Sequence, residues 1–121
     1  MKRKPLFWVG SSKDDLRAFP EDVMGHALDI AQQGGKSMAA KPLSGFGGAG
    51  VLEIVDDFDG STYRAVYTVL LADAVYVLHT FQKKSKKGIA TPKPVLDQIH
   101  NRLKRAREHH AEWHRAAGET P

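Results

Sequence analysis

The chain has 121 residues, of which 41% are hydrophobic and 26% are charged, and its formal net charge is +4. This length and composition are typical of one globular domain, so we expect a single domain over 1–121 with a frayed end at 115–121. The lack of cysteine excludes a disulfide scaffold, thiolate catalysis and Cys-ligated zinc. Apolar runs are too short for a membrane span or a signal-peptide core, so we expect a soluble, cytoplasmic protein without membrane partners.

Charge is distributed unevenly along the chain. Residues 83–115 hold ten Lys or Arg and three acids, whereas the rest holds eight basic and eleven acidic side chains. Such a segregated charge indicates a polyanionic partner, either nucleic acid or an acidic protein. A solvated basic helix without a partner is the alternative. Lys83, Lys84, Lys86 and Lys87 directly follow a predicted strand and repel one another unless an anion binds, which favours nucleic acid.

The first third of the chain predicts a strand and a pair of helices. The apolar run Leu6–Val9 is typical of a short strand. Ser12, with Asp15 three residues later, is typical of a capped helix start. A second helix is expected over 20–33, because it opens with proline and two glycines follow it. Residues 36–50 are then expected to form a loop.

Three strands and a helix are predicted after this loop. The strands cover 51–55, 62–71 and 75–81 as an antiparallel meander, with a hairpin turn at Asp57–Gly60. The helix opens near Pro92. Its apolar seam recurs every three or four positions: Leu96, Ile99, Leu103, Ala106, His110 and Trp113. The order β-α-α-β-β-β-α predicts an α+β domain, with two helices on one face of a small antiparallel sheet and the C-terminal helix on the other.

Three patterns that imitate ligand motifs have simpler explanations. Gly45–Gly50 fits G-x-G-x-x-G, but a loop precedes it and a strand follows it, whereas a dinucleotide site needs a strand before it and a helix after it. His110 and His114 lie four residues apart without a third metal ligand. The acids at 56–59 suit a hairpin turn. We therefore predict no metal site and no cofactor.

Arg64 and His79 are the candidates for chemistry outside the lysine run. Arg64 lies within the apolar stretch Tyr63–Tyr67, where a cation is costly to bury without an anion, and its fork of donors suits phosphate. RNA cleavage through the 2′-hydroxyl needs a cation, a base and an acid, which Arg64, the lysines and His79 could supply without metal. In the alternative, Arg64 pairs with an acid such as Glu53 and the lysines are solvated.

Several stretches together resemble the phage-derived HigB-like branch of the RelE/ParE toxin superfamily, over about residues 5–110. The stretches are Lys41–Ile54, Tyr63–Tyr67, Val77–Lys86 and Thr91-Pro92, of which Tyr-Arg-x-Val-Tyr and His-x-Phe-x-Lys-Lys are the most specific. The resemblance implies a RelE-like fold and the toxin of a type II toxin–antitoxin system. Such a toxin is a ribosome-dependent mRNA endonuclease (mRNA interferase) that arrests growth, and a helix-turn-helix, HigA-like antitoxin neutralises it.

The resemblance also implies roles for single residues. Arg64 matches the arginine that acts on the scissile phosphate. Lys84, with Lys83 beside it, matches a second basic residue that contacts phosphate or assists the leaving group. The basic face would bind messenger and ribosomal RNA through Lys86, Lys87, Lys93, Lys104, Arg105 and Arg107.

The chain departs from RelE-type enzymes at the general base. Their lysines on the preceding strand correspond here to Glu53 and Val55, and no tyrosine follows Tyr76. The base is therefore open among His79, a lysine within 83–87 and Glu53, and His79 can equally be a packed strand residue that hydrogen-bonds a neighbour. A ParE-like toxin that binds DNA gyrase, or a catalytically decayed binding protein, remain alternative functions.

Overall fold

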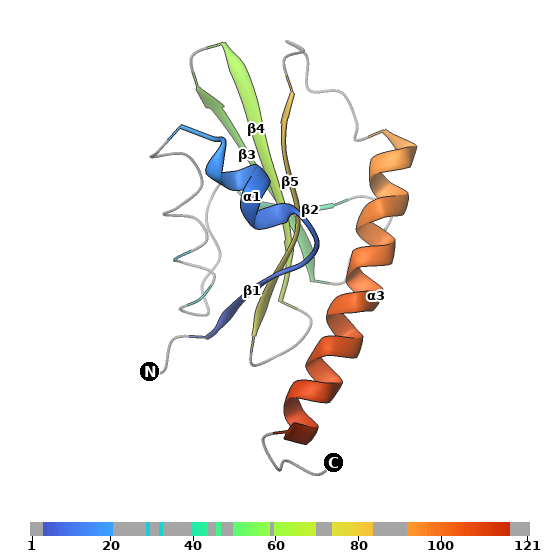
Figure 1. Cartoon of the computed structure of the whole chain (residues 1–121). Coiled ribbons are helices and arrows are strands. Elements are labelled where there is room, and N and C mark those ends of the chain that lie inside the picture. Colours follow the sequence, from blue (N-terminus) through green and yellow to red (C-terminus); the bar gives the residue numbers. More distant parts are fainter. Residues whose placement is uncertain are drawn as a thin grey trace.

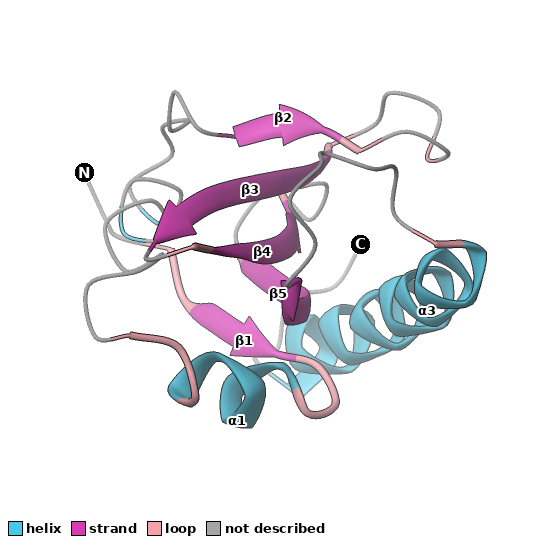
Figure 2. Cartoon of the chain, turned by 90° about the horizontal axis from the view of Figure 1, so that it is seen from above, coloured by secondary structure: helices cyan, strands magenta, loops and turns pink. Residues whose placement is uncertain are grey.

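A five-stranded mixed sheet forms the centre of the computed structural model. The structure describes residues 4–20, 29, 32, 40–43, 46, 50–58, 60–69, 74–83 and 92–116. Its strands are β1 (Leu6–Trp8), β2 (Ala40–Pro42), β3 (Val51–Phe58), β4 (Ser61–Thr68) and β5 (Val75–Lys83), and its helices are α1 (Ser12–Arg17) and α3 (Lys93–Ala116). The strands lie in the order β1-β5-β4-β3-β2, and the long helix α3 runs beside the sheet (Figures 1 and 2). This α+β architecture confirms the predicted fold class.

The antiparallel meander β3-β4-β5 is the centre of the sheet, as predicted. In the pairing of β3 with β4, Val51 lies opposite Thr68 at one end and Phe58 lies opposite Ser61 at the other. This register leaves a two-residue turn between the strands. Gly60 adopts a φ of 79° in this turn, where side chains are strained. β1 adds to the outer edge of β5 in parallel, so that the N-terminal segment completes the sheet.

The expectation of a loop over 36–50 is wrong in part, because β2 lies within it. Ala40 pairs with Ile54 and Pro42 with Leu52, in an antiparallel edge strand. A proline has no N–H to donate, which restricts it to sheet edges, and three residues are too few for an alternating pattern. The predicted strand bounds also shift, since β3 continues to residue 58 and β4 ends at residue 68.

The start of α1 differs from the prediction by one residue. Ser11 occupies the N-cap position, without a side-chain cap hydrogen bond, and its hydroxyl instead donates to the Asp15 carboxylate over 2.8 Å. Ser12 is fully buried and donates to the Val77 carbonyl, while the Thr80 hydroxyl donates to the Ser12 carbonyl over 2.7 Å. Tertiary packing against β5 therefore determines the role of Ser12, which local capping rules cannot predict.

Two predicted segments fall mostly outside the described residues. Of the helix expected over 20–33, the structure describes Asp29 and Gln32 as helical, and Gln32 exchanges hydrogen bonds with the backbone of Lys4. At the other end, α3 continues to Ala116, two residues into the segment expected to fray. No helix in the described part of the chain combines the length and apolar character that a membrane-spanning segment needs.

Two apolar clusters fill the opposite faces of the sheet. One cluster joins β3, β4 and β5 to Leu16 and Phe19 at α1. The other joins the same strands to α3, where Ile99, Leu103 and Ala106 are buried. The predicted seam of α3 is thus confirmed, and α1 and α3 pack on different faces as expected. Each large apolar side chain buried in this way contributes about 1.5–3 kcal/mol.

Candidate functional site

Arg64 is buried in the middle of the sheet, with 6% of its surface exposed. It stands on β4 between Val55 of β3 and Phe81 of β5. Because side chains alternate along a strand, Arg64 shares the α3-facing side with Val66. Its Nη1 donates to the Glu53 carboxylate over 3.2 Å, and this pair is the alternative that the sequence left open.

The guanidinium of Arg64 is only partly engaged by this pair. Its Nε is buried and has no hydrogen-bond partner in the described part of the chain. Glu53 is also largely enclosed, since 14% of its side chain is exposed. A buried pair of this kind compensates the two charges, but the remaining donor edge of the guanidinium still favours an anion.

His79 lies on β5, two positions before Phe81, and is hydrogen-bonded to α3. Arg102 Nη1 approaches His79 Nδ1 to 2.9 Å. An arginine side chain can only donate, so Nδ1 is the acceptor and the neutral ring carries its proton on Nε2. Burial, and next the nearby Arg102 cation, lower the pKa of His79, although Asp15 opposes them. His79 is therefore neutral at pH 7 and donates from Nε2.

Arg102 links three elements around His79. The register of β4 and β5 shifts between Val66 and Tyr67, which leaves Leu78 as the extra residue of a β-bulge. Arg102 Nη1 donates to the Leu78 carbonyl over 3.0 Å, and Nη2 donates to the Ser11 hydroxyl over 3.2 Å. Gly10 covers the guanidinium closely, with a φ of 60°. Arg102 thus fixes the bulge and the turn before α1 in one arrangement.

A pocket of about 330 Å³ opens beside His79, between α1 and the end of β5. Asp15 and Phe19 line it on the α1 side, and His79 and Gln82 line it on the strand side. It offers a carboxylate and an imidazole within a partly apolar wall. Among the described residues, no three His, Cys, Asp or Glu side chains are grouped as a metal site. A carboxylate and a neutral imidazole can relay a proton or bind a hydrogen-bond donor.

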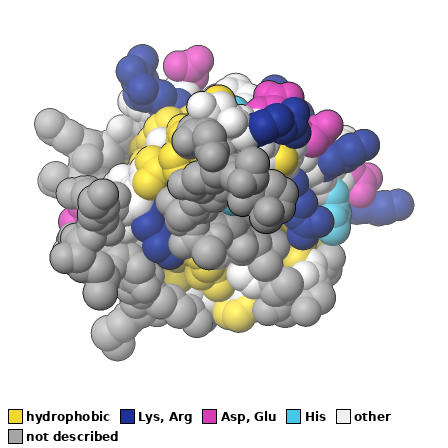
Figure 3. Space-filling view, turned by 90° about the horizontal axis from the view of Figure 1, so that it is seen from below, with side chains coloured by type: hydrophobic (Ala, Val, Ile, Leu, Met, Phe, Trp, Pro, Cys, Tyr) yellow, Lys and Arg dark blue, Asp and Glu magenta, His cyan; other side chains and the backbone are white. Residues whose placement is uncertain are grey.

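The predicted basic residues are placed only in part. The backbone of Lys83 ends β5 opposite Thr62, whereas Lys84, Lys86 and Lys87 lie outside the described residues. The α3 cations are exposed, namely Lys93, Lys104, Arg105 and Arg107. In Figure 3, basic side chains of the described residues lie among acidic ones rather than in one continuous patch.

Sequence reasoning missed Arg102 and the pair of Tyr76 and His109. Arg102 is three residues after Ile99 and four before Ala106, so it lies on the buried stripe of α3. The spacing of Arg102 from Ile99 and Ala106 is the sequence signal that could have predicted its burial. The Tyr76 hydroxyl lies 2.7 Å from His109 Nδ1, a contact between elements that no local pattern indicates.

Comparisons with known proteins identify the family of this chain. A search of curated proteins finds no match. Among solved structures, the toxin–antitoxin complex RelBE2 from Mycobacterium tuberculosis is similar, with 18% identity and a TM-score of 0.43 over 70% of this chain and 97% of that chain. This likeness is too distant to support an argument. Residues 14–104 match the family described as phage-derived protein Gp49-like. The chain therefore belongs to the phage-derived Gp49-like family, a RelE/HigB-like family of toxins, which confirms the resemblance seen in its sequence.

Proposed function

We propose that this chain is the toxin of a type II toxin–antitoxin system and that it cuts mRNA on the ribosome without a metal ion. Translation and growth would then stop, and a helix-turn-helix, HigA-like antitoxin would restore them. The site of action of such a protein is the cytoplasm. Family membership supports the toxin role, and the buried Arg64–Glu53 pair in the middle of the sheet carries the proposal of catalysis.

Arg64 and Glu53 can divide the chemistry of RNA cleavage between them. The Glu53 carboxylate would take the proton of the 2′-hydroxyl, whose oxygen then forms a bond to phosphorus while the bond to the 5′-oxygen breaks. The products are a 2′,3′-cyclic phosphate and a free 5′-hydroxyl, whose proton a lysine such as Lys84 or Lys83 would supply. The unpartnered Nε of Arg64 supports its role as donor to the charged phosphate in the transition state.

His79 fits this scheme as a hydrogen-bond donor rather than as the general base. Its Nδ1 already accepts from Arg102, and its Nε2 carries the proton of the neutral ring. A lowered pKa keeps the ring uncharged at pH 7, so it can neither take a proton at Nδ1 nor act as a strong acid. Among the three candidate bases, the geometry therefore favours Glu53 over His79.

The exposed cations of α3 would contact ribosomal RNA in this scheme. Lys93, Lys104 and Arg107 extend from the helix into solvent, and the lysines at 83–87 would continue the contact toward Arg64. Phosphate contacts of this kind are independent of sequence and weaken steeply with salt. The ribosome would then present the mRNA in line for 2′-hydroxyl attack, which accounts for much of the rate enhancement.

A reconstituted translation reaction with mapped mRNA 5′ ends tests the proposal. We expect cuts at ribosome-occupied codons, and a loss of about 10²–10³-fold in cleavage rate with Arg64→Lys, which keeps the charge but loses the fork. Glu53→Gln keeps an acceptor for Arg64 and should lose cleavage as well. Arg17→Gln, which removes an exposed charge of α1 outside the proposed RNA-binding face, is the control for surface charge and should retain most of the rate. Full cleavage by folded Arg64→Lys and Glu53→Gln proteins would refute the assigned site.

The compensation of Arg64 by Glu53 favours one second candidate, a toxin that binds DNA gyrase without nuclease activity. If the guanidinium served only to join two strands, the fold would need no phosphate ligand. A DNA-damage response on induction, with mRNA left intact, would support this function. Intact mRNA together with normal growth would indicate a decayed toxin that only binds a partner.

A further inference from the structure

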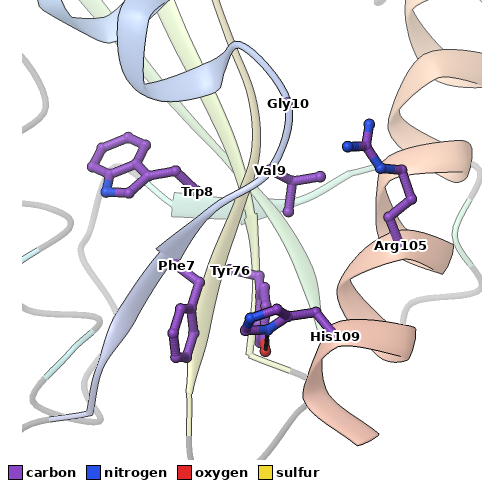
Figure 4. A pocket seen from close by; sticks show the side chains of 7 residues that line it. All are labelled: Phe7, Trp8, Val9, Gly10, Tyr76, Arg105 and His109. Atoms are coloured by element: carbon purple, nitrogen blue, oxygen red, sulfur yellow. Dashed lines mark hydrogen bonds between the residues drawn. The ribbon is translucent and has the colours of Figure 1, made fainter. Parts of the chain in front are cut away.

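A second pocket lies at the opposite end of β5, between β1 and α3 (Figure 4). Its volume is about 190 Å³, which is below the range of about 300–1,000 Å³ that is typical of drug-sized ligands. Phe7, Val9 and Gly10 line it from the β1 side, and Arg105 and His109 line it from α3. A single small group therefore fits it better than a helix or an extended peptide does.

The floor of this pocket is a fixed aromatic cluster. The ring of Phe7 stacks on Tyr76 at a centroid distance of 5.0 Å, and His109 lies 4.9 Å from Phe7. Trp113 supports Phe7 from its edge, at 5.4 Å. The Tyr76 hydroxyl holds His109 Nδ1 at 2.7 Å, so the imidazole has one orientation before any ligand binds. In either tautomer, Nε2 of His109 is the nitrogen that this hydrogen bond does not use.

Arg105 supplies positive charge to this aromatic pocket. It is exposed one helical turn before His109, and among the described residues no ion pair compensates it. Its side chain rises from α3 at the side of the pocket opposite Phe7 (Figure 4). The buried Arg102 cation lies three residues earlier, and its pKa is lowered first by burial and then by the charge of Arg105, although Asp15 opposes them. The lining contains no Asp or Glu, so an anion is the ligand that relieves this repulsion.

We propose that this pocket holds the base of one unpaired ribonucleotide against His109 and Phe7, while the exposed Arg105 at the side of the pocket holds its phosphate. Aromatic rings beside a cation are how proteins hold single-stranded nucleic acid, because every base has a π face that stacks on a ring. Lys104 and Arg107 are exposed on the same helix and continue the charge along a phosphate chain. The inference that the nucleotide is part of a longer RNA rests on the proposed function. Binding of a free nucleotide to the pocket can be tested independently of that function.

Titration of the full-length protein with adenosine 5′-monophosphate, followed by NMR, tests the pocket. We expect shifts at Gly10 and His109, and a loss of affinity of at least about tenfold with Arg105→Gln, because this variant removes the charge-assisted contact to the phosphate. Arg115→Gln is the matched control, an exposed arginine on the same helix that does not line the pocket. It should change the affinity less than twofold. Phe7→Leu should weaken the nucleotide without weakening inorganic phosphate.

Three results would overturn the proposal. Equal losses in Arg105→Gln and Arg115→Gln would indicate diffuse charge attraction. Equal affinity for inorganic phosphate and the nucleotide would leave only an anion site. An acidic aromatic peptide that shifts the same residues, when the nucleotide does not, would assign the pocket to a protein partner. Arg64→Lys should leave the nucleotide-induced shifts at Gly10 and His109 unchanged while it lowers the cleavage rate. Failure of the proposed cleavage reaction and failure of the proposed pocket can therefore be told apart.

Discussion

The two ends of β5 handle charge in opposite ways. Near the C-terminal end of β5, Arg64 is buried and forms an ion pair with Glu53. Arg102 is also buried there, beneath Gly10, and donates hydrogen bonds to Leu78, His79 and Ser11. Near the start of β5, Arg105 and His109 are exposed on the surface of α3. Buried charges are expensive unless satisfied, and exposed ones are not. The first end is therefore a rigid arrangement whose parts depend on one another, whereas the second has charge available to a ligand from solution.

The largest expected effect comes from breaking the buried pair. Arg64→Ala breaks the buried ion pair between Arg64 and the largely enclosed Glu53 carboxylate, so we expect a loss of about 3–5 kcal/mol in the free energy of unfolding, measured with urea. Replacing both residues by methionine should recover most of that loss, because the buried carboxylate is removed as well. Arg17→Ala is the exposed control, since Arg17 and Asp14 are 4.0 Å apart in solvent, and it should cost less than about 0.5 kcal/mol.

That comparison also shows what would contradict the assignment of a rigid end. If Arg64→Ala unfolds at the same urea concentration as Arg17→Ala, then water reaches Glu53 and the pair is not enclosed. The double methionine variant separates stability from function, since it should fold and yet leave mRNA uncut. A folded, active double variant would place the chemistry elsewhere in the molecule.

We expect the next largest loss of stability from substitution of Gly10. This glycine lies against the buried Arg102 and also lines the pocket beside Arg105. A Cβ at Gly10 would lie 2.8 Å from Nε of Arg102, and the φ of 60° is itself unfavourable for alanine. Gly60 has a φ of 79°, and a Cβ added there would have no atom within 4 Å. Gly60→Ala therefore measures the energetic cost of the positive φ alone. We expect Gly60→Ala to lose about 1–2 kcal/mol and Gly10→Ala to lose about 1–3 kcal/mol more.

Thermal or urea unfolding of both alanine variants checks this difference, and Arg102 identifies its cause. In an Arg102→Ala background the extra cost of Gly10→Ala should disappear, as a double-mutant cycle measures. An equal cost at Gly10 and Gly60 in the wild-type background would mean that Arg102 moves aside freely. The guanidinium would then not be a fixed link between α3 and the bulge.

The sequence predicted the fold better than it predicted the site. Hydrophobic alternation and the seam of α3 are local sequence patterns, and they predicted the meander and the helix. β2 was too short to show an alternating pattern, so it was not predicted. The site depends on contacts between distant elements. Glu53 was a possible partner for Arg64, but only the register of β3 and β4 brings the two side chains together. Arg102 looked like one of many cations on a basic helix, because its burial depends on the bulge at Leu78.

The smallest effect is the pH dependence of stability that His79 produces. Its folded-state pKa lies below its ordinary value, first through burial and then through Arg102, so the unfolded chain binds the proton more tightly. The native state is thus fully stabilised above about pH 6.5, and stability falls as the pH drops through the lowered pKa of the folded protein. Urea unfolding between pH 8 and pH 5 should show this decline, and it should be shallower in His79→Asn, which offers Arg102 an acceptor that does not titrate. An unchanged slope would mean that protonated His79 is tolerated beside Arg102, and the end of β5 would then be less rigid than its hydrogen bonds indicate.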